Sequence, residues 1–132
     1  MAIKVSPVSI PTADACAFVY VPVLFNNVAV SDVYDLSTLR VVGVLWDEAN
    51  DIWGTGVSFN MAFEEAGDLF PVNKVADDGL SVIPYEIPTL LNGMTAIDID
   101  TLAGVRFLQV VCGQQPGSVI TGQLYLVLRE LT

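Results

Sequence analysis

The sequence predicts an all-β fold, either an antiparallel β-sandwich or a jelly-roll-like barrel with short irregular loops. Short apolar or alternating segments recur along the chain, and clusters of Gly, Pro, Asn and Asp separate them. No segment keeps the 3.6-residue period of an amphipathic helix over roughly 11 residues. The length of 132 residues fits one domain. We assign residues 17–132 to a single sandwich domain and residues 1–16, which contain two prolines, to an N-terminal arm or edge strand.

Each expected element follows from local pattern. The expected strands lie at residues 17–25, 39–46, 57–63, 69–75, 95–99, 105–113 and 122–131. Turns or loops are expected at residues 26–27, 35–38, 47–56, 64–68, 76–79 and 113–121. The segments on either side of residues 64–68 predict a β-hairpin, in which Gly67 can adopt a positive φ. We expect residues 80–94 to be irregular because of Pro84, Pro88 and Gly93, and residues 100–104 to form one helical turn.

The last two strands are apolar on both faces, which raises the question of what covers the second face. Alternate side chains of a strand point to opposite sides. We expect one face of the last strand to lie in the core, because leucine has no polar atom to satisfy; its residues are Leu124, Leu126 and Leu128. We expect the opposite face to contact a partner. The predicted interface consists of Tyr125, Val127, Arg129, Arg106 and Tyr20.

The aromatic residues are likewise assigned either to the core or to an interface. Five are expected in the core: Trp46, Trp53, Phe59, Phe63 and Phe107. Three tyrosines are candidates for an interface, because each combines an apolar ring with a polar tip: Tyr20, Tyr34 and Tyr125. A sugar-binding platform could use the same residue types.

The charge excludes some partners. The formal net charge is −10, from 15 acidic and 5 basic residues. Nucleic-acid binding needs Lys and Arg to neutralise phosphates, and the sequence shows no basic cluster among Lys4, Arg40, Lys74, Arg106 and Arg129. Nucleic acid and anionic membranes are therefore not expected partners. No apolar run approaches the about 20 residues that span a bilayer, and residues 1–15 lack the pattern of a secretory signal, so we expect synthesis in the cytoplasm.

The residue inventory predicts no catalytic role and no cofactor. Histidine is absent, which removes the commonest general base and transition-metal ligand. Carboxylates gather only in expected turns or at strand ends, where a solvated role is the ordinary one, although a weak calcium site at residues 47–51 or 98–100 stays open. Cys16 and Cys112 are expected to be reduced and to act as small apolar residues, while one disulfide between them stays open.

Several motifs resemble a group of small virion structural proteins of tailed bacteriophages. The similarity lies in "LRVVGVLW" (39–46), "VSFNMAFEEAGDLFPV" (57–72), "DTLAGVRFLQVVCG" (100–113), "QQPGSV" (114–119) and "GQLYLVLREL" (122–131), in that order. Val111 and Cys112 stand where the group has a basic residue, and "DEANDIWGTG" replaces its Trp-bearing loop. The group brings no catalytic residues to transfer.

The resemblance implies a capsid decoration or cement protein that acts by protein–protein binding. Expected partners are the major capsid protein or other virion proteins, together with further copies of the chain in a homo-oligomer. The expected location is the outer surface of the virion, away from packaged DNA. A neck, tail or fibre-anchoring protein is the alternative within this setting, and a carbohydrate-binding β-sandwich module is the alternative from another class.

Overall fold

Strands make up all the regular secondary structure of the described chain, so the all-β prediction is confirmed. The structure is a computed structural model that describes residues 3–4, 18–23, 25, 30–36, 39–47, 56–90, 92–98, 101–102, 104–112 and 123–130. The strands are β1 (Ile3–Lys4), β2 (Val19–Val23), β3 (Val30–Asp35), β4 (Leu39–Asp47), β5 (Gly56–Ala62), β6 (Phe70–Pro71), β7 (Asn73–Val75), β8 (Val82–Pro84), β9 (Glu86–Pro88), β10 (Gly93–Ala96), β11 (Phe107–Cys112) and β12 (Gln123–Glu130).

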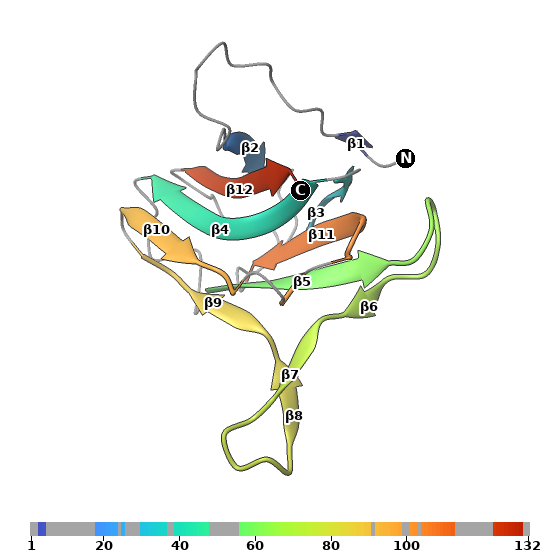
Figure 1. The fold of residues 1–132 in the computed structure, drawn as a ribbon, viewed down its shortest axis with the longest axis vertical. Helices are drawn as coiled ribbons and strands as arrows, with labels where there is room; N and C mark the ends of the chain where they lie inside the picture. The colour runs from blue at the N-terminus through green and yellow to red at the C-terminus, as the bar shows by residue number, and fades with distance from the viewer. Residues whose placement is uncertain are drawn as a thin grey trace.

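Two sheets form the body of the molecule (Figure 1). The four-stranded sheet has the order β10-β4-β12-β2, and all its neighbours are antiparallel. The six-stranded sheet has the order β1-β3-β11-β5-β6, with β9 also paired to β5; only β1 and β3 are parallel. Neither sheet closes into a barrel, which favours the sandwich over the barrel alternative.

The core lies between these sheets. In the four-stranded sheet Leu126 is opposite Val44 on one neighbouring strand and Val21 on the other. From the six-stranded sheet come Val57, Phe59, Leu108, Val110 and Cys112. The predicted leucine face is confirmed, because each of its three members is 0% exposed: Leu124, Leu126 and Leu128. Packing of this inner face therefore sets the register of β12, since a slip of one residue would turn the leucines outward.

Some predicted elements differ from those observed. β3 was not expected, and residues 80–94 contain β8, β9 and the start of β10 rather than an irregular segment. The prediction was wrong because a proline was expected to exclude a strand, whereas Pro84 and Pro88 are the last residues of β8 and β9. Thr101 and Leu102 lie in a turn and not in a helical turn, with the Thr101 N–H donating to the Asp98 carbonyl.

Burial also corrects two aromatic assignments. Trp46, Phe59 and Phe107 are buried as predicted. Phe63 is 80% exposed, because β5 ends at Ala62 and the chain turns out of the sandwich there. Tyr34 is 3% exposed and belongs to the core cluster, so it is not available to a partner. Trp53 lies outside the described residues.

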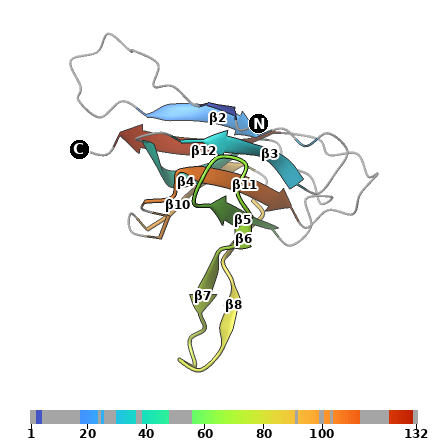
Figure 2. The ribbon, with the colours of Figure 1, turned by 90° about the vertical axis from the view of Figure 1, so that its right-hand side faces the viewer.

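A two-stranded ribbon projects from the sandwich. The predicted hairpin partner of β5 pairs with it only over Phe70–Pro71, after which β7 turns away and pairs with β8. Both views show this ribbon, residues 73–84, pointing away from the sheets at one end of the long axis (Figures 1 and 2). β2 and β12 lie at the opposite end. No described residue of β7 or β8 is buried, so the ribbon adds nothing to the core.

Candidate interaction surfaces

Four of the predicted interface residues lie together on the four-stranded sheet. Residues directly opposite on paired strands point to the same side. Tyr125 is opposite Pro22 on β2 and Leu45 on β4, and Val127 is opposite Tyr20. The side facing away from the core, here called the outer face, presents Tyr20, Pro22, Leu45, Met94, Ala96, Tyr125 and Arg129.

Val127 is a correction to the predicted interface, because it is only 1% exposed. It lies in the middle of the outer face, between Tyr20 on β2 and Gly43 on β4. The Met94 side chain occupies the space that a Cβ at Gly43 would need. A partner approaching this face would therefore contact Tyr20, which is 53% exposed, before Val127.

Arg106 is not brought to this surface. It precedes β11 in the six-stranded sheet, where its Nε and Nη2 donate to the two carboxylate oxygens of Asp35 at 2.9 and 3.2 Å. The Asp35 side chain is 6% exposed and that of Arg106 57%. The hydrogen bonds and the charge of Asp35 raise the pKa of Arg106, and its guanidinium lies 5.0 Å from the centre of the Phe107 ring. This arginine neutralises a buried carboxylate rather than joining the predicted interface.

Two arginines meet on the outer face, which the sequence did not reveal. Arg129 on β12 is directly opposite Arg40 on β4. Like charges in this position repel each other, and the Nε of Arg40 is buried without a hydrogen-bond partner. The net charge of −10 makes such a pair unusual within the chain. The outer face is therefore largely apolar, with the two arginines towards one end of β4 and exposed Asp47 at the other end.

The outer side of the six-stranded sheet is different because polar side chains bridge its strands. The Asn60 side-chain amide donates to Gln109 at 3.0 Å, and the Gln109 amide donates to the Ser31 carbonyl at 2.9 Å. These bonds link β5, β11 and β3. A face with its polar groups satisfied in this way gains little from burial against a partner.

The second candidate surface is the ribbon and its root. Among the described residues twelve large apolar side chains are exposed, and seven of these fall between residues 63 and 83. They are Phe63, Leu69, Phe70, Val75, Leu80, Val82 and Ile83. Leu80, at the tip, is 91% exposed. Such concentration is unlike the scattered apolar residues of an ordinary surface and is typical of an interaction site.

Hydrogen bonds within the turn define its conformation at the tip of the ribbon. Asp78 Oδ1 accepts from the N–H groups of Leu80 and Ser81 at 2.8 and 3.1 Å, and Asp78 Oδ2 accepts from the Ser81 hydroxyl at 3.2 Å. The two backbone hydrogen bonds lower the pKa of Asp78. Gly79 has φ of 72°, a conformation that favours glycine. The turn therefore places Leu80 at the tip of the ribbon, where its side chain is exposed.

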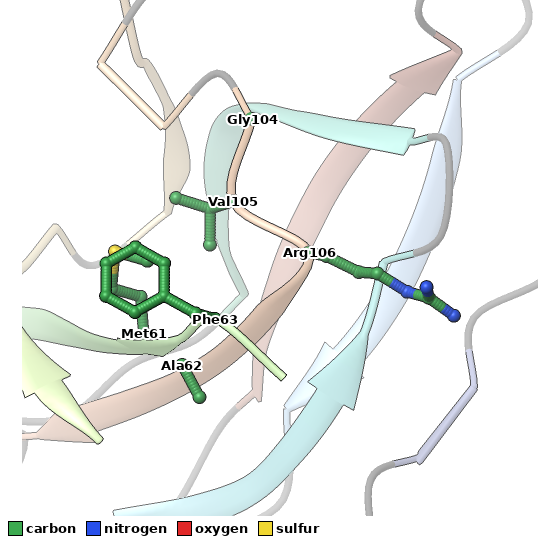
Figure 3. A pocket seen from close by; sticks show the side chains of 6 residues that line it. All are labelled: Met61, Ala62, Phe63, Gly104, Val105 and Arg106. Carbon is green, nitrogen blue, oxygen red and sulfur yellow. The ribbon is translucent and has the colours of Figure 1, made fainter. Parts of the chain in front are cut away.

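The root of the ribbon borders a shallow hollow of about 310 Å³. Its lining residues are Met61, Ala62, Phe63, Gly104, Val105 and Arg106. Figure 3 shows the Phe63 ring beside Met61 and Val105, while the Arg106 side chain points away from them. The Phe63 and Phe70 rings lie 5.8 Å apart. The lining of the hollow is mainly apolar and brings no polar side chains together, so it suits the binding of an apolar group and not a chemical reaction.

Within the described ranges no three His, Cys, Asp or Glu side chains gather as a metal site would require. Glu48, Asp51 and Asp100, which belong to the suggested calcium loops, lie outside the described residues, as does Cys16. Cys112 is buried in the core, as expected for a small apolar residue. The described part of the chain also contains no helix with the length and hydropathy to cross a membrane.

Two exposed surfaces thus remain as the candidate sites, and both suit binding to another macromolecule. The sequence did contain a signal for the ribbon, namely the prolines at its two ends. Pro71 and Pro84 bracket two three-residue strands around the Asp-Asp-Gly turn, and such short, proline-bounded strands rarely sit inside a sheet. Comparison of the chain with protein-family models, curated proteins and solved structures finds no match.

Proposed function

We propose that the chain is a structural virion protein of a tailed bacteriophage, a decoration or cement protein bound to the outside of the capsid. Its work is protein–protein binding without turnover. The motif resemblance between residues 39 and 131 supports the phage setting. The ribbon supports the binding mode, because its exposed apolar side chains have no role in the fold of the chain itself.

The exposed apolar ribbon is the observation that carries the proposal. A two-stranded ribbon is only marginally stable alone in water, and exposing Leu80 and Val82 favours association with another surface. Each apolar side chain that binding removes from water contributes about 25 cal/mol of favourable binding free energy per Å² of apolar area, before the costs of association are subtracted. A binding partner would therefore stabilise the ribbon as well as the complex.

The charge favours the outside of the particle over the inside. A net charge of −10 is repelled by packaged DNA. Of the five basic residues, Arg106 is engaged with Asp35, and Arg40 and Arg129 lie opposite each other on neighbouring strands. A surface that holds DNA would need a continuous basic patch.

The test is whether the chain binds phage particles. The purified chain is incubated with capsids from which decoration proteins have been stripped, and bound chain is measured in the capsid fraction of a density gradient. Saturable binding is expected. Binding to isolated tails or necks but not to capsids would move the protein to the alternative virion position. Binding to glycans by Tyr20 and Tyr125, with no binding to any particle component, would replace the proposal with the carbohydrate-binding alternative.

A further inference from the structure

We propose that the apolar hollow at the root of the ribbon binds one bulky apolar side chain of a basic segment of another virion protein. Lys or Arg residues beside that side chain contact the carboxylates of Glu64 and Asp68. The inference rests on the proposed function and deepens it, because it gives the chemistry of the segment that the root of the ribbon contacts.

The hollow is an uncovered continuation of the core. Alternate residues of β5 point to the side of the core. Along this series Phe59 is 1% exposed, Met61 is half-buried, and Phe63, one residue beyond the end of the strand, is 80% exposed. Figure 3 shows the Phe63 ring beside Met61 and Val105. The inner side of the strand therefore leaves the sandwich before its apolar residues end, and Phe63 is left to water or to a partner.

The neighbouring strand β6 widens this apolar area. Phe70 is directly opposite Met61, and its ring lies 5.8 Å from that of Phe63. Phe70 and Leu69 are 47% and 39% exposed. The volume of about 310 Å³ is at the lower end of the range of about 300–1,000 Å³ for small-molecule pockets. Because the hollow is also shallow, it suits one side chain of a larger partner better than a whole small molecule.

The turn between the two phenylalanines adds negative charge to the rim of the hollow. A hydrogen bond from the Gly67 N–H to the Glu64 carbonyl, at 3.0 Å, closes this turn. Its exposed carboxylates are Glu64, Glu65 and Asp68. Among the side chains that the structure describes, no Lys or Arg forms an ion pair with any of the three.

Arg106 lines the hollow but does not neutralise the rim. Its guanidinium is bonded to Asp35 and points away from the apolar side chains (Figure 3). The hydrogen bonds and charge of Asp35, and after these the charge of Glu65, raise the pKa of Arg106. Glu65 is therefore partly engaged with this arginine, whereas Glu64 and Asp68 have no such cation beside them among the described side chains.

Charge decides which occupant fits. A second copy would bring a net charge of −10, and Asp77 and Asp78 lie at the tip of its ribbon, so like charges would meet. DNA and anionic lipid headgroups are disfavoured for the same reason. A protein segment that joins an apolar side chain to Lys or Arg matches both parts of the surface, because the apolar group leaves water while its cations contact carboxylates at the solvent-exposed rim.

The binding experiment uses the full chain and a defined peptide probe. The probe is a fluorescein-labelled nonapeptide with one leucine between two pairs of arginines in a serine background. Fluorescence anisotropy is measured with the chain at up to about 1 mM, because contacts of this size give micromolar to millimolar affinities. We expect saturable binding that weakens as salt is raised. Replacing the arginines by glutamate, or the leucine by serine, should weaken binding at least about tenfold.

A matched pair of variants tests the apolar part of the site. Phe63→Ser is compared with Tyr20→Ser, which removes an exposed aromatic ring from the outer face of the four-stranded sheet. We expect Phe63→Ser to bind the peptide at least about tenfold more weakly and Tyr20→Ser to bind it as the wild-type chain does. Thermal melts show whether each variant keeps the fold.

A second pair tests the rim. The double variant Glu64→Gln with Asp68→Asn is compared with Asp32→Asn with Asp47→Asn, which removes the same charge from exposed positions elsewhere. We expect only the rim variant to lose most of the salt dependence and to bind the peptide at least about tenfold more weakly at low salt.

Absence of binding to the wild-type chain, equal binding of the glutamate peptide, or equal binding by the two members of either pair would overturn the inference. Capsid binding is measured with the same variants. Capsid binding that is unchanged in Phe63→Ser overturns this inference and leaves the proposed function standing. A chain that binds the peptide at this site but binds no particle refutes the proposed function alone.

Discussion

Truncation of Leu126 to alanine tests the assignment of the two faces of β12. Leu126 is 0% exposed on the central strand of the four-stranded sheet, opposite Val21 and Val44. Neighbours on both sides are held by sheet pairing, so the site can collapse only partly around the missing atoms. Leucine-to-alanine changes at such sites cost about 2–5 kcal/mol of unfolding free energy. The total free energy of unfolding of a domain of this size is about 5–15 kcal/mol, so the substitution removes a large fraction of the stability.

The assay is thermal unfolding followed by circular dichroism, together with denaturant titration. For a chain of this length each kcal/mol lowers Tm by about 3–5 °C, so Leu126→Ala should lower Tm by roughly 6–25 °C. The denaturant m-value should stay unchanged, because the surface exposed on unfolding is nearly the same. Both experiments are run at low protein concentration to limit any contribution from self-association.

Leu80→Ala is the matched control, because it removes the same atoms from a side chain that is 91% exposed. Its effect on stability should lie within about 0.5 kcal/mol, the usual range for surface sites. Tyr125→Ala should cost less stability than Leu126→Ala, since Tyr125 is half-buried on the outer face. A stable Leu126→Ala protein beside an unfolded Tyr125→Ala protein would mean that the assignment of the strand faces is inverted.

Three further predictions concern the tip, the buried carboxylate and nucleic acid. Because the pKa of Asp78 is lowered in the folded chain, its hydrogen bonds stabilise the turn fully at pH values above the ordinary pKa of 3.8, and this stabilisation is lost as the pH falls through the lower pKa of the folded state. An NMR titration of the Leu80 and Ser81 amide protons should therefore show a midpoint below pH 3.8. A midpoint at or above pH 3.8 would contradict the turn geometry. Arg106→Gln should lower the midpoint of denaturant unfolding, because Asp35 stays buried with weaker partners; an unchanged midpoint would show that the pair contributes nothing. No DNA binding should be detected at physiological salt, and a salt-sensitive gel shift with duplex DNA would show that the charge argument is wrong.

The sequence predicted the parts of the fold that follow from local alternation. The leucine periodicity of β12 identified its buried side, and "LRVVGVLW" identified β4, because burial on the inner side requires an apolar residue at every second position. β3, with the sequence VSDVYD, carries two aspartates and was missed. Its Asp35 is tolerated in a buried position through Arg106, a partner 71 residues away in the chain that no local pattern reveals.

The candidate surfaces were predicted only in part, for reasons that depend on pairing between distant strands. Alternation placed Tyr125 and Arg129 on one side, but the register with β2 and β4 was needed to bring Tyr20 and Arg40 beside them. Alternation places Val127 on this side as well, but it does not show that the side chain is only 1% exposed. The ribbon was missed because residues 69–75 were expected to pair with β5 along their length, whereas β7 pairs with β8.

The central claim is that the chain is a surface component of a tailed-phage particle, and mass spectrometry of purified particles tests it most directly. Particles are collected from lysates of the phage that encodes the chain, banded in a density gradient, and digested with protease either intact or after disruption. We expect peptides of the chain in the capsid band at a constant ratio to the major capsid protein, with the chain cleaved in intact particles at segments other than the ribbon, which the proposed contact covers. Absence of the chain from the band, or protection from protease until the capsid is opened, would contradict the account.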